Sequence, residues 1–297
     1  MKKKFLSILC VIVLSHGMLQ SISAQQSKAD YYQAGTYEYA GITLPYRQLE
    51  LNQGQEGSSI LIIQLHGGTA RGNDNIAQLD ASAVDSVENY LRANQLKSIF
   101  LLPQCAADRV WNESTKSQTT PMTIVLTHWL QEFIGENDID QTRIYITGYS
   151  AGGSGSWRML NDNTSMFAAG CIAAANPLMV QVANVAHTPV YAVAGSNDNI
   201  MDATKIETFV NSLIEAGGEA QFDLLQGKDH FGTCNEAFTQ TRLDWLFSHS
   251  RADSPTDIHQ PQINMSQPTK RMIDGQIYIT RDDVEYNILG YRVHSNY

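Results

Sequence analysis

The sequence predicts an α/β fold in which helices cover both faces of an open, mostly parallel, doubly wound sheet. Three observations support this prediction. Short apolar or β-branched segments alternate with segments of helical periodicity along most of the 297 residues. Several of the apolar segments lack polar alternation, as expected for parallel strands that are buried on both faces. Hydrophobic residues make up 43% of the chain and charged residues 17%, which favours a large buried core over a disordered chain.

The first expected element is an antiparallel edge hairpin over residues 37–51, where apolar and polar residues alternate. Six core strands are then expected, at residues 59–65, 98–103, 143–149, 169–175, 189–194 and 220–225. Helical patterns separate or follow them, at residues 76–94, 121–134, 151–160, 202–216 and 235–249. Two strand-like runs, 276–281 and 284–293, flank Asp282 and Asp283 and predict a short C-terminal β-hairpin. In an open sheet of this kind, ligands bind beyond the carboxyl ends of the strands.

The N-terminus has the pattern of a secretory signal peptide. Lysines occupy positions 2–4, an apolar run covers residues 5–14, and small residues lead to Ala24, so cleavage is expected after Ala24 or one residue earlier. The run is shorter than the about 20 residues that span a bilayer, and no membrane span is expected. The chain is thus divided into a signal peptide (1–24), a main domain (25–251), a linker with three prolines (252–268) and a tail (269–297). We expect an exported protein, periplasmic or extracellular, with attachment to the cell surface left open.

Charge and cysteine content narrow the expectations further. The formal net charge is −10, which disfavours binding to nucleic acid or to anionic membrane surfaces. Beyond the signal peptide the chain keeps Cys105, Cys171 and Cys234, and three cysteines cannot all pair. Cys171 lies in an apolar stretch and is expected to be a small buried residue. Whether Cys105 and Cys234 form a disulfide is left open.

The strongest motif is Gly148-Tyr149-Ser150-Ala151-Gly152, which follows a predicted strand and precedes a predicted helix. In a nucleophile elbow the chain turns so sharply that only glycine fits two residues before and two after the serine, whose hydroxyl projects above the sheet. The alternative is a glycine turn in which Ser150 is a helix N-cap. The strand–turn–helix context favours Ser150 as a nucleophile.

A serine nucleophile needs a base, usually histidine, and an acid that orients the base. In a fold with a nucleophile elbow these residues occur along the chain in the order serine, acid, histidine. Of the later histidines, His230 alone follows the last core strand. Asp198 follows the strand that ends at residue 194, which brings it to the same edge of the sheet. Asp202 is the reserve and is expected to cap the next helix, whereas Asp229 is too close to His230 in sequence.

The oxyanion of a tetrahedral intermediate requires amide donors. The N–H of Ala151 is one, and Leu65-His66-Gly67-Gly68 supplies another, expected to be that of Gly68. His66 is expected to hold this loop rather than act as a base. No spacing of cysteine or histidine suits a metal and no phosphate or dinucleotide fingerprint is present, so neither a metal nor a cofactor is expected.

These segments, in this order, resemble secreted α/β-hydrolase esterases of the feruloyl esterase, acetyl xylan esterase and polyhydroxybutyrate depolymerase group, which are prolyl-oligopeptidase-like serine hydrolases. The resemblance begins at about Thr43 with TLPYR and continues through LHGGTARGNDN, FLLPQC, TRIYITGYSAGGSGSW, VAGSNDNIM and GKDHFG to LDWLF, a range that spans most of the chain after residue 24. It implies a triad of Ser150, Asp198 and His230 with Gly68 and Ala151 in the oxyanion hole. Gly68, Thr69 and Ala70 stand where the group often has Ala-Gly-Glu, which leaves the second donor open. GQIYITRD and YNILGYRV look like short C-terminal modules of secreted bacterial proteins.

The length of one loop narrows the class of substrate. This loop follows the predicted strand at residues 169–175, the first strand after the elbow. Residues 176–188 leave room only for a loop or a short helix, so no lid domain is expected. An open site suits a small-molecule or polysaccharide-linked ester more than a lipid. Trp111 and Trp157 are candidates for lining the acyl pocket, with buried packing as the alternative. The leading hypothesis is a serine carboxylic ester hydrolase that acts on acetyl or hydroxycinnamoyl esters of plant polysaccharide. A serine peptidase and a non-catalytic carbohydrate-binding or surface module are the alternatives.

Overall fold

The computed structural model describes residues 27–112, 121–251, 269–273, 276–281 and 284–287. The expected signal peptide, the linker and the Asp282-Asp283 turn lie outside these residues. The chain divides into two compact units, residues 1–250 and 251–297. Within the described segments, no helix combines the length and the apolar character needed to cross a bilayer.

The first unit is built on an eight-stranded sheet with the order β1-β2-β4-β3-β5-β6-β7-β8. β1 pairs with β2, and β2 with β4, in antiparallel register, and all other pairs are parallel. The strands are β1 (Gln33–Tyr39), β2 (Ile42–Leu51), β3 (Ser59–Leu65), β4 (Ser98–Pro103), β5 (Ile139–Tyr149), β6 (Ala169–Ala173), β7 (Val190–Gly195) and β8 (Ala220–Leu225). The predicted edge hairpin and the mostly parallel core are therefore confirmed. β3 and β4 are buried at every position, which explains why their sequences lack polar alternation.

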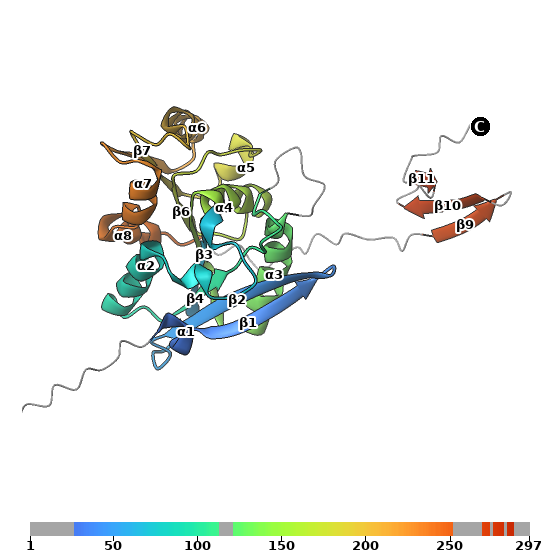
Figure 1. The fold of residues 1–297 in the computed structure, drawn as a ribbon, viewed down its shortest axis with the longest axis horizontal. Helices are drawn as coiled ribbons and strands as arrows, with labels where there is room; N and C mark the ends of the chain where they lie inside the picture. Colours follow the sequence, from blue (N-terminus) through green and yellow to red (C-terminus); the bar gives the residue numbers. More distant parts are fainter. Residues whose placement is uncertain (1–26, 113–120, 252–268, 274–275, 282–283, 288–297) are drawn as a thin grey trace, which may run out of the picture. The chain divides into compact units, whose positions relative to one another are not determined.

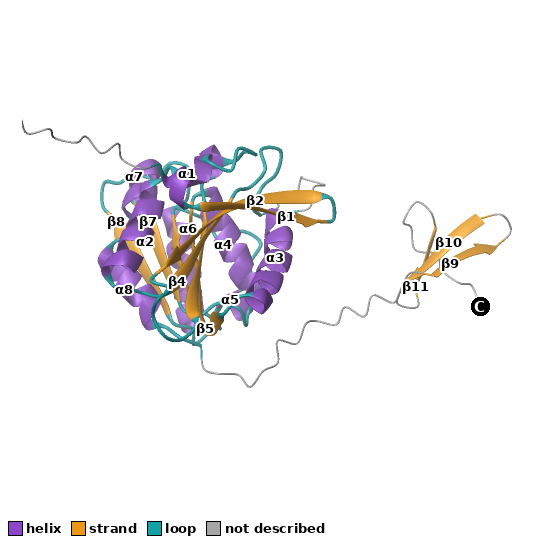
Figure 2. Ribbon diagram, turned by 90° about the horizontal axis from the view of Figure 1, so that it is seen from below, coloured by secondary structure: helices purple, strands orange, loops and turns teal. Residues whose placement is uncertain are grey.

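Helices cover both faces of the sheet (Figure 1, Figure 2). One apolar core contains residues of α3 (Met122–Glu136), α4 (Ala151–Asp162), α5 (Val182–Val185) and α6 (Ala203–Glu215). The other contains residues of α2 (Ser82–Ala93) and α8 (Gln240–Ser248), with the short α1 (Lys28–Tyr31) and α7 (His230–Glu236) on the same side. The loop after β6 holds only the four-residue α5, and the fold has no lid domain there.

Two predicted helices are divided in the structure. The expected helix at residues 76–94 is a 3-10 turn, Ala77–Leu79, followed by α2, because the backbone of Asp80 is not helical (φ −92°, ψ 68°). The expected helix at residues 235–249 becomes α7 and α8. α7 begins earlier, at His230, because the Asp229 carboxylate caps it by accepting the N–H of Gly232.

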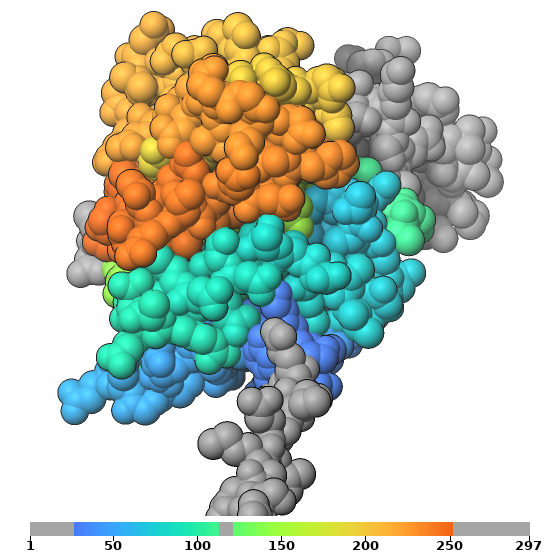
Figure 3. Space-filling model, turned by 60° about the vertical axis from the view of Figure 1, so that its left-hand side comes forward, coloured from blue at the N-terminus to red at the C-terminus, as the bar shows by residue number. Residues whose placement is uncertain are grey.

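Helices far apart in sequence meet on one side of the sheet. α2 packs against α7 and α8, and the Ser82 hydroxyl lies 3.1 Å from the side-chain oxygen of Asn235, 153 residues away. Figure 3 shows the teal surface of α2 directly against the orange surface of α7 and α8. This contact forms one wall of the pocket described below.

The second unit contains a three-stranded antiparallel sheet with the order β11-β10-β9. Its strands are β9 (Thr269–Ile273), β10 (Gln276–Arg281) and β11 (Val284–Asn287). The predicted hairpin corresponds to β10 and β11. β9 was not predicted, because adjacent Lys270 and Arg271 interrupt any alternation of apolar and polar residues in its sequence.

Candidate active site

Ser150 stands at a sharp turn between β5 and α4. Its backbone is in the left-handed region (φ 54°, ψ −124°), which a non-glycine residue adopts only under strain. A Cβ on Gly148 would lie 2.6 Å from the carbonyl oxygen of Gly152, and one on Gly152 would lie 2.0 Å from that of Leu65. Neither position accepts a side chain, because the obstructing atoms are backbone. The steric account of the glycine spacing therefore holds for this turn.

A chain of hydrogen bonds joins Ser150 to His230 and Asp198. The Ser150 Oγ lies 2.8 Å from His230 Nε2, and His230 Nδ1 lies 2.9 Å from Asp198 Oδ2. The side chains of His230 and Asp198 are 6% and 1% exposed, so the ion-pairing face of the imidazole is shielded from water. The loop after β7 supplies the acid, the first residue of α7 supplies the base, and β5 leads into the serine. The structure thus brings together the three residues that sequence reasoning selected.

The Asp198 carboxylate is held from both sides. Its Oδ1 accepts the backbone N–H groups of Ile200 and Met201, at 2.9 and 2.8 Å, which leaves Oδ2 directed at His230. Asp202, the reserve candidate, instead caps α6 through the N–H groups of Thr204 and Lys205. The geometry therefore favours Asp198 over Asp202 as the partner of His230.

Two glycine-rich segments place amide donors beside Ser150. The N–H of Ala151 is the first of α4, and amides in a first helical turn have no intrahelical acceptor. Gly68 opens a 3-10 turn, Gly68–Ala70, and a Cβ on it would lie 3.9 Å from that of Ala151. The two residues expected to bind an oxyanion are therefore neighbours across the site, although 83 positions separate them in the sequence.

His66 fixes the loop that carries Gly68. Its Nε2 accepts the N–H of Cys105 at 2.9 Å, so the proton resides on Nδ1, which donates to the Gly67 carbonyl at 2.7 Å. Burial lowers the pKa of His66 to about 4, and the imidazole is neutral at neutral pH. With both nitrogens engaged, His66 has the structural role that the sequence suggested.

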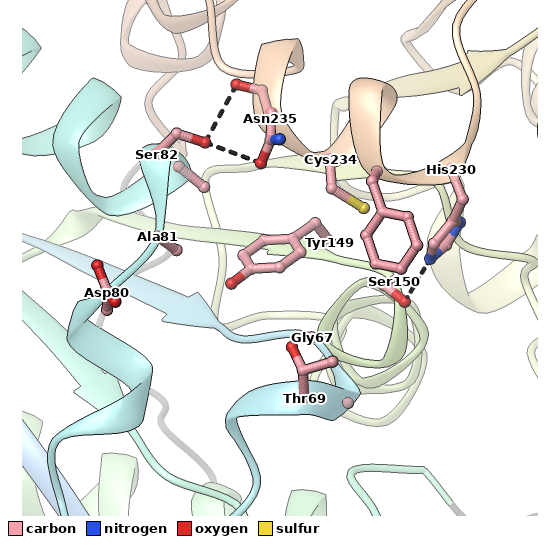
Figure 4. A pocket seen from close by; sticks show the side chains of 13 residues that line it. Gly67, Thr69, Asp80, Ala81, Ser82, Tyr149, Ser150, His230, Cys234 and Asn235 are labelled. Carbon is pink, nitrogen blue, oxygen red and sulfur yellow. Dashed lines mark hydrogen bonds between the residues drawn. The ribbon is translucent and has the colours of Figure 1, made fainter.

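A pocket of about 370 Å³ opens beside Ser150 and His230 (Figure 4). Its wall is formed by the loop after β3, the start of α2 and the helix α7 (Figure 3). The lining residues are Gly67, Gly68, Thr69, Asp80, Ala81, Ser82, Ala83, Tyr149, Ser150, His230, Phe231, Cys234 and Asn235. Sequence reasoning missed Asp80, Ser82 and Asn235, because all three fell inside predicted helices, at residues 76–94 and 235–249, and no local pattern marked them as pocket residues.

The two tryptophans proposed as substrate contacts do not line this pocket. Trp111 and Trp157 are 2% and 0% exposed. The indole N–H of Trp111 donates to the His66 carbonyl and that of Trp157 to the Ala175 carbonyl. The expectation that they line an acyl pocket is corrected: they pack in the core on the α3–α6 side of the sheet, the alternative that sequence reasoning left open.

The cysteines of the described residues are free thiols. Cys105, Cys171 and Cys234 are all buried, so Cys105 and Cys234 do not form a disulfide in this structure. Cys234 lines the pocket, and burial raises the pKa of its thiol to about 12. The thiol is therefore protonated at neutral pH, and it is a weak nucleophile beside the Ser150–His230 pair.

Comparison with known proteins agrees with this geometry. The sequence model of the dienelactone hydrolase family matches residues 104–244, which include Ser150, Asp198 and His230. The chain has the α/β-hydrolase fold. No curated protein sequence gives a significant match.

Solved structures provide the fold neighbours. A thermostable esterase is 25% identical, with a TM-score of 0.67 over 75% of this chain and 64% of that protein, so the chain spans less than two thirds of its length. A ferulic acid esterase is 14% identical, with a TM-score of 0.56 over 73% of this chain and 97% of the other. An S-formylglutathione hydrolase from Staphylococcus aureus is 11% identical, with a TM-score of 0.55 over 73% and 98% of the two chains.

Proposed function

We propose that this protein is an exported serine carboxylic ester hydrolase that acts through an acyl-serine intermediate. The hydrogen-bonded chain from Ser150 through His230 to Asp198 is the observation that carries the proposal. A neutral hydroxyl is a weak nucleophile, and this arrangement supplies the base that activates it and the acid that orients the base. The dienelactone hydrolase family match and the esterase among the fold neighbours support hydrolysis of an ester.

In the first half of the proposed reaction, Ser150 Oγ attacks the ester carbonyl carbon while His230 Nε2 takes the hydroxyl proton. The carbonyl oxygen becomes an oxyanion, which the N–H groups of Gly68 and Ala151 stabilise. Asp198 accepts the Nδ1 proton in a hydrogen bond and stabilises the imidazolium without being protonated. When the C–O bond to the alcohol breaks, His230 gives its proton to the departing oxygen and leaves the acyl group on Ser150.

The second half repeats these steps with water. His230 Nε2 removes a proton from a water molecule, whose oxygen attacks the acyl carbon, and the same two amides hold the new oxyanion. Collapse of this intermediate breaks the bond to Ser150 Oγ, which regains its proton from His230. The carboxylic acid product leaves, and the free enzyme is restored.

The proposed substrates are acetyl or hydroxycinnamoyl esters carried by plant polysaccharide. Support comes from the open pocket without a lid domain, which suits an acyl group that protrudes from a bulky partner, and from the motifs shared with secreted esterases. A ferulic acid esterase is among the proteins with the same fold. The signal-peptide pattern at residues 1–24 supports the export of such an enzyme from the cytoplasm.

Labelling by a fluorophosphonate probe tests the serine chemistry. The purified protein should be labelled, Ser150→Ala should not, and Ser154→Ala, one turn further along α4, should be labelled like the wild type. The Ser150→Ala variant should also lose about 10⁶ in kcat on an ester that the wild type hydrolyses. A chain that is folded but never labelled would instead be a non-catalytic module.

A panel of acetyl, feruloyl and longer acyl esters, with the amide counterpart of each, tests the substrate class. Faster cleavage of the esters, with preference for acetyl or feruloyl groups, is expected. Preference for the amides would favour the peptidase alternative.

A further inference from the structure

The pocket has a chemically distinct end away from Ser150. In Figure 4 the Tyr149 ring separates the Ser150–His230 pair from Asp80, and Ser82 and Asn235 lie above that ring. All six residues line the pocket. A substrate group that extends from the scissile ester along the Tyr149 ring therefore reaches Asp80.

Asp80 presents a carboxylate without a partner in the described part of the chain. It is solvent-exposed, lies in a non-helical conformation between the 3-10 turn Ala77–Leu79 and α2, and lines the pocket. No hydrogen bond or ion pair joins its side chain to another described residue. Asp80 is also the only Asp or Glu among the lining residues, and neither Lys nor Arg is found there.

Two lysines near this pocket are engaged in ion pairs. Lys28, whose Nζ donates to the Leu79 carbonyl, forms an ion pair with Asp85 at 2.6 Å. Lys228, two residues before His230 in the sequence, is paired with Glu236. Arg71 donates to the carbonyl of Gly68, in the loop that carries the oxyanion donor. Among the residues that line the pocket, Asp80 therefore carries the only carboxylate, and no lining lysine or arginine offsets its charge.

We infer that Asp80 is a specificity-determining residue that excludes negatively charged groups from the part of the substrate that fills this pocket. Like charges that approach within several ångströms in a half-open site repel each other, and the repulsion weakens as salt is added. A carboxylate also accepts hydrogen bonds from hydroxyl groups, and Asn235 adds an amide that can donate. The inference rests on the proposed ester hydrolysis and assigns its substrate class: esters on neutral sugars rather than on uronic acids.

Two matched pairs of esters test this inference on the purified protein. The first pair is the 2-O-acetyl ester of methyl glucoside and that of methyl glucuronide, which differ only in CH₂OH against COO⁻ at C6. The second is dimethyl and monomethyl succinate, which places the charge on the acyl side instead. For each pair, kcat/KM is measured for the wild type, Asp80→Asn, Asp80→Lys and Glu215→Gln, at low and high salt.

For each enzyme and each pair, the kcat/KM of the neutral ester is divided by that of the anionic ester. Dividing this ratio for the wild type by the same ratio for Asp80→Asn cancels the intrinsic reactivity of the esters. We expect this quotient to be about fivefold to tenfold in at least one pair, larger still with Asp80→Lys, and smaller at high salt. Glu215→Gln removes one charge from the exposed end of α6 and should keep the wild-type ratio.

A quotient near one in both pairs, with neutral esters hydrolysed normally, would overturn the inference and leave the proposed function standing. The same change in Glu215→Gln as in Asp80→Asn would also overturn it, because the effect would then belong to overall charge. Failure of the wild type to hydrolyse any of the four esters, together with no fluorophosphonate labelling, would refute the proposed function itself.

Discussion

Replacing Asp198 with asparagine tests how the proposed base is oriented. The Asp198 Oδ1 accepts two backbone N–H groups, and its Oδ2 faces the Nδ1 of His230. An asparagine has one oxygen and one NH₂ group for these two positions. The outcome therefore depends on which of them faces the two backbone amides.

The hydrogen bonds decide the orientation. Turning the NH₂ group toward the amides of Ile200 and Met201 would set donors against donors and lose two hydrogen bonds, together about 2 kcal/mol or more. Keeping the oxygen there sets the NH₂ group against His230, which only moves the imidazole proton from Nδ1 to Nε2. The second arrangement is favoured, and in it Nε2 can no longer accept the Ser150 proton. We expect kcat to fall by about 10⁴, a rise of about 5 kcal/mol in the barrier.

The assay compares kcat and KM of Asp198→Asn with those of Asp202→Asn on one neutral ester, with thermal unfolding as a check of the fold. Asp202 caps α6 through two amides, and asparagine caps helices about as well as aspartate does. Asp202→Asn should therefore keep the wild-type kcat and lose at most about 1 kcal/mol of stability. Asp198→Asn should keep a similar KM and a native unfolding transition.

An active Asp198→Asn beside an inactive Asp202→Asn would refute the assignment and move the acid by about one helical turn. Retention of a tenth of the wild-type kcat by Asp198→Asn would show that His230 keeps its tautomer without this carboxylate. In that case the hydrogen-bond argument above would be wrong even though the residues are in contact.

Three further predictions concern the stability of the fold and the role of the tail. Gly152→Ala would place a Cβ 2.0 Å from the Leu65 carbonyl oxygen and should lower the free energy of unfolding, measured with urea, by about 3 kcal/mol. Gly54→Ala is the control, because open space surrounds Gly54, and it should change that free energy by less than about 0.5 kcal/mol. Equal effects of the two substitutions would contradict the steric argument. The pKa of His66 is lowered to about 4 in the folded protein from an ordinary 6.5, so between these two pH values the unfolded chain binds a proton that the folded chain does not. The free energy of unfolding should therefore fall as the pH drops from about 6.5 to 4, by up to about 3 kcal/mol. His66→Gln should lack that part of the pH dependence, and an unchanged slope would show that another group causes it. A chain that ends at Arg251 should remain an active hydrolase, because every proposed catalytic residue precedes that position; an insoluble or inactive product would show that the tail is needed.

Much of the sheet and of the candidate triad was predictable because both follow from local patterns. Apolar runs marked the parallel strands, and the carboxyl ends of parallel strands meet at one edge of a sheet. A serine in a glycine-flanked turn, an aspartate and a histidine that each follow a strand were therefore expected to lie together. β9, the first strand of the tail along the chain, was not predicted because its residues carry no such pattern.

The sequence by itself determined the succession of strands and helices along the chain and the elbow at Ser150. It also determined the edge of the sheet at which Asp198 and His230 lie. Only the tertiary structure decided which side chains face the pocket. Trp111 and Trp157 were candidates for lining the acyl pocket, yet both pack in the core and donate hydrogen bonds to backbone carbonyls. Asp80 and Asn235 share a pocket because α2 packs on α7, a contact between segments about 150 residues apart. Local periodicity determines which face of a helix is apolar, but the neighbour of that face depends on how the whole chain packs.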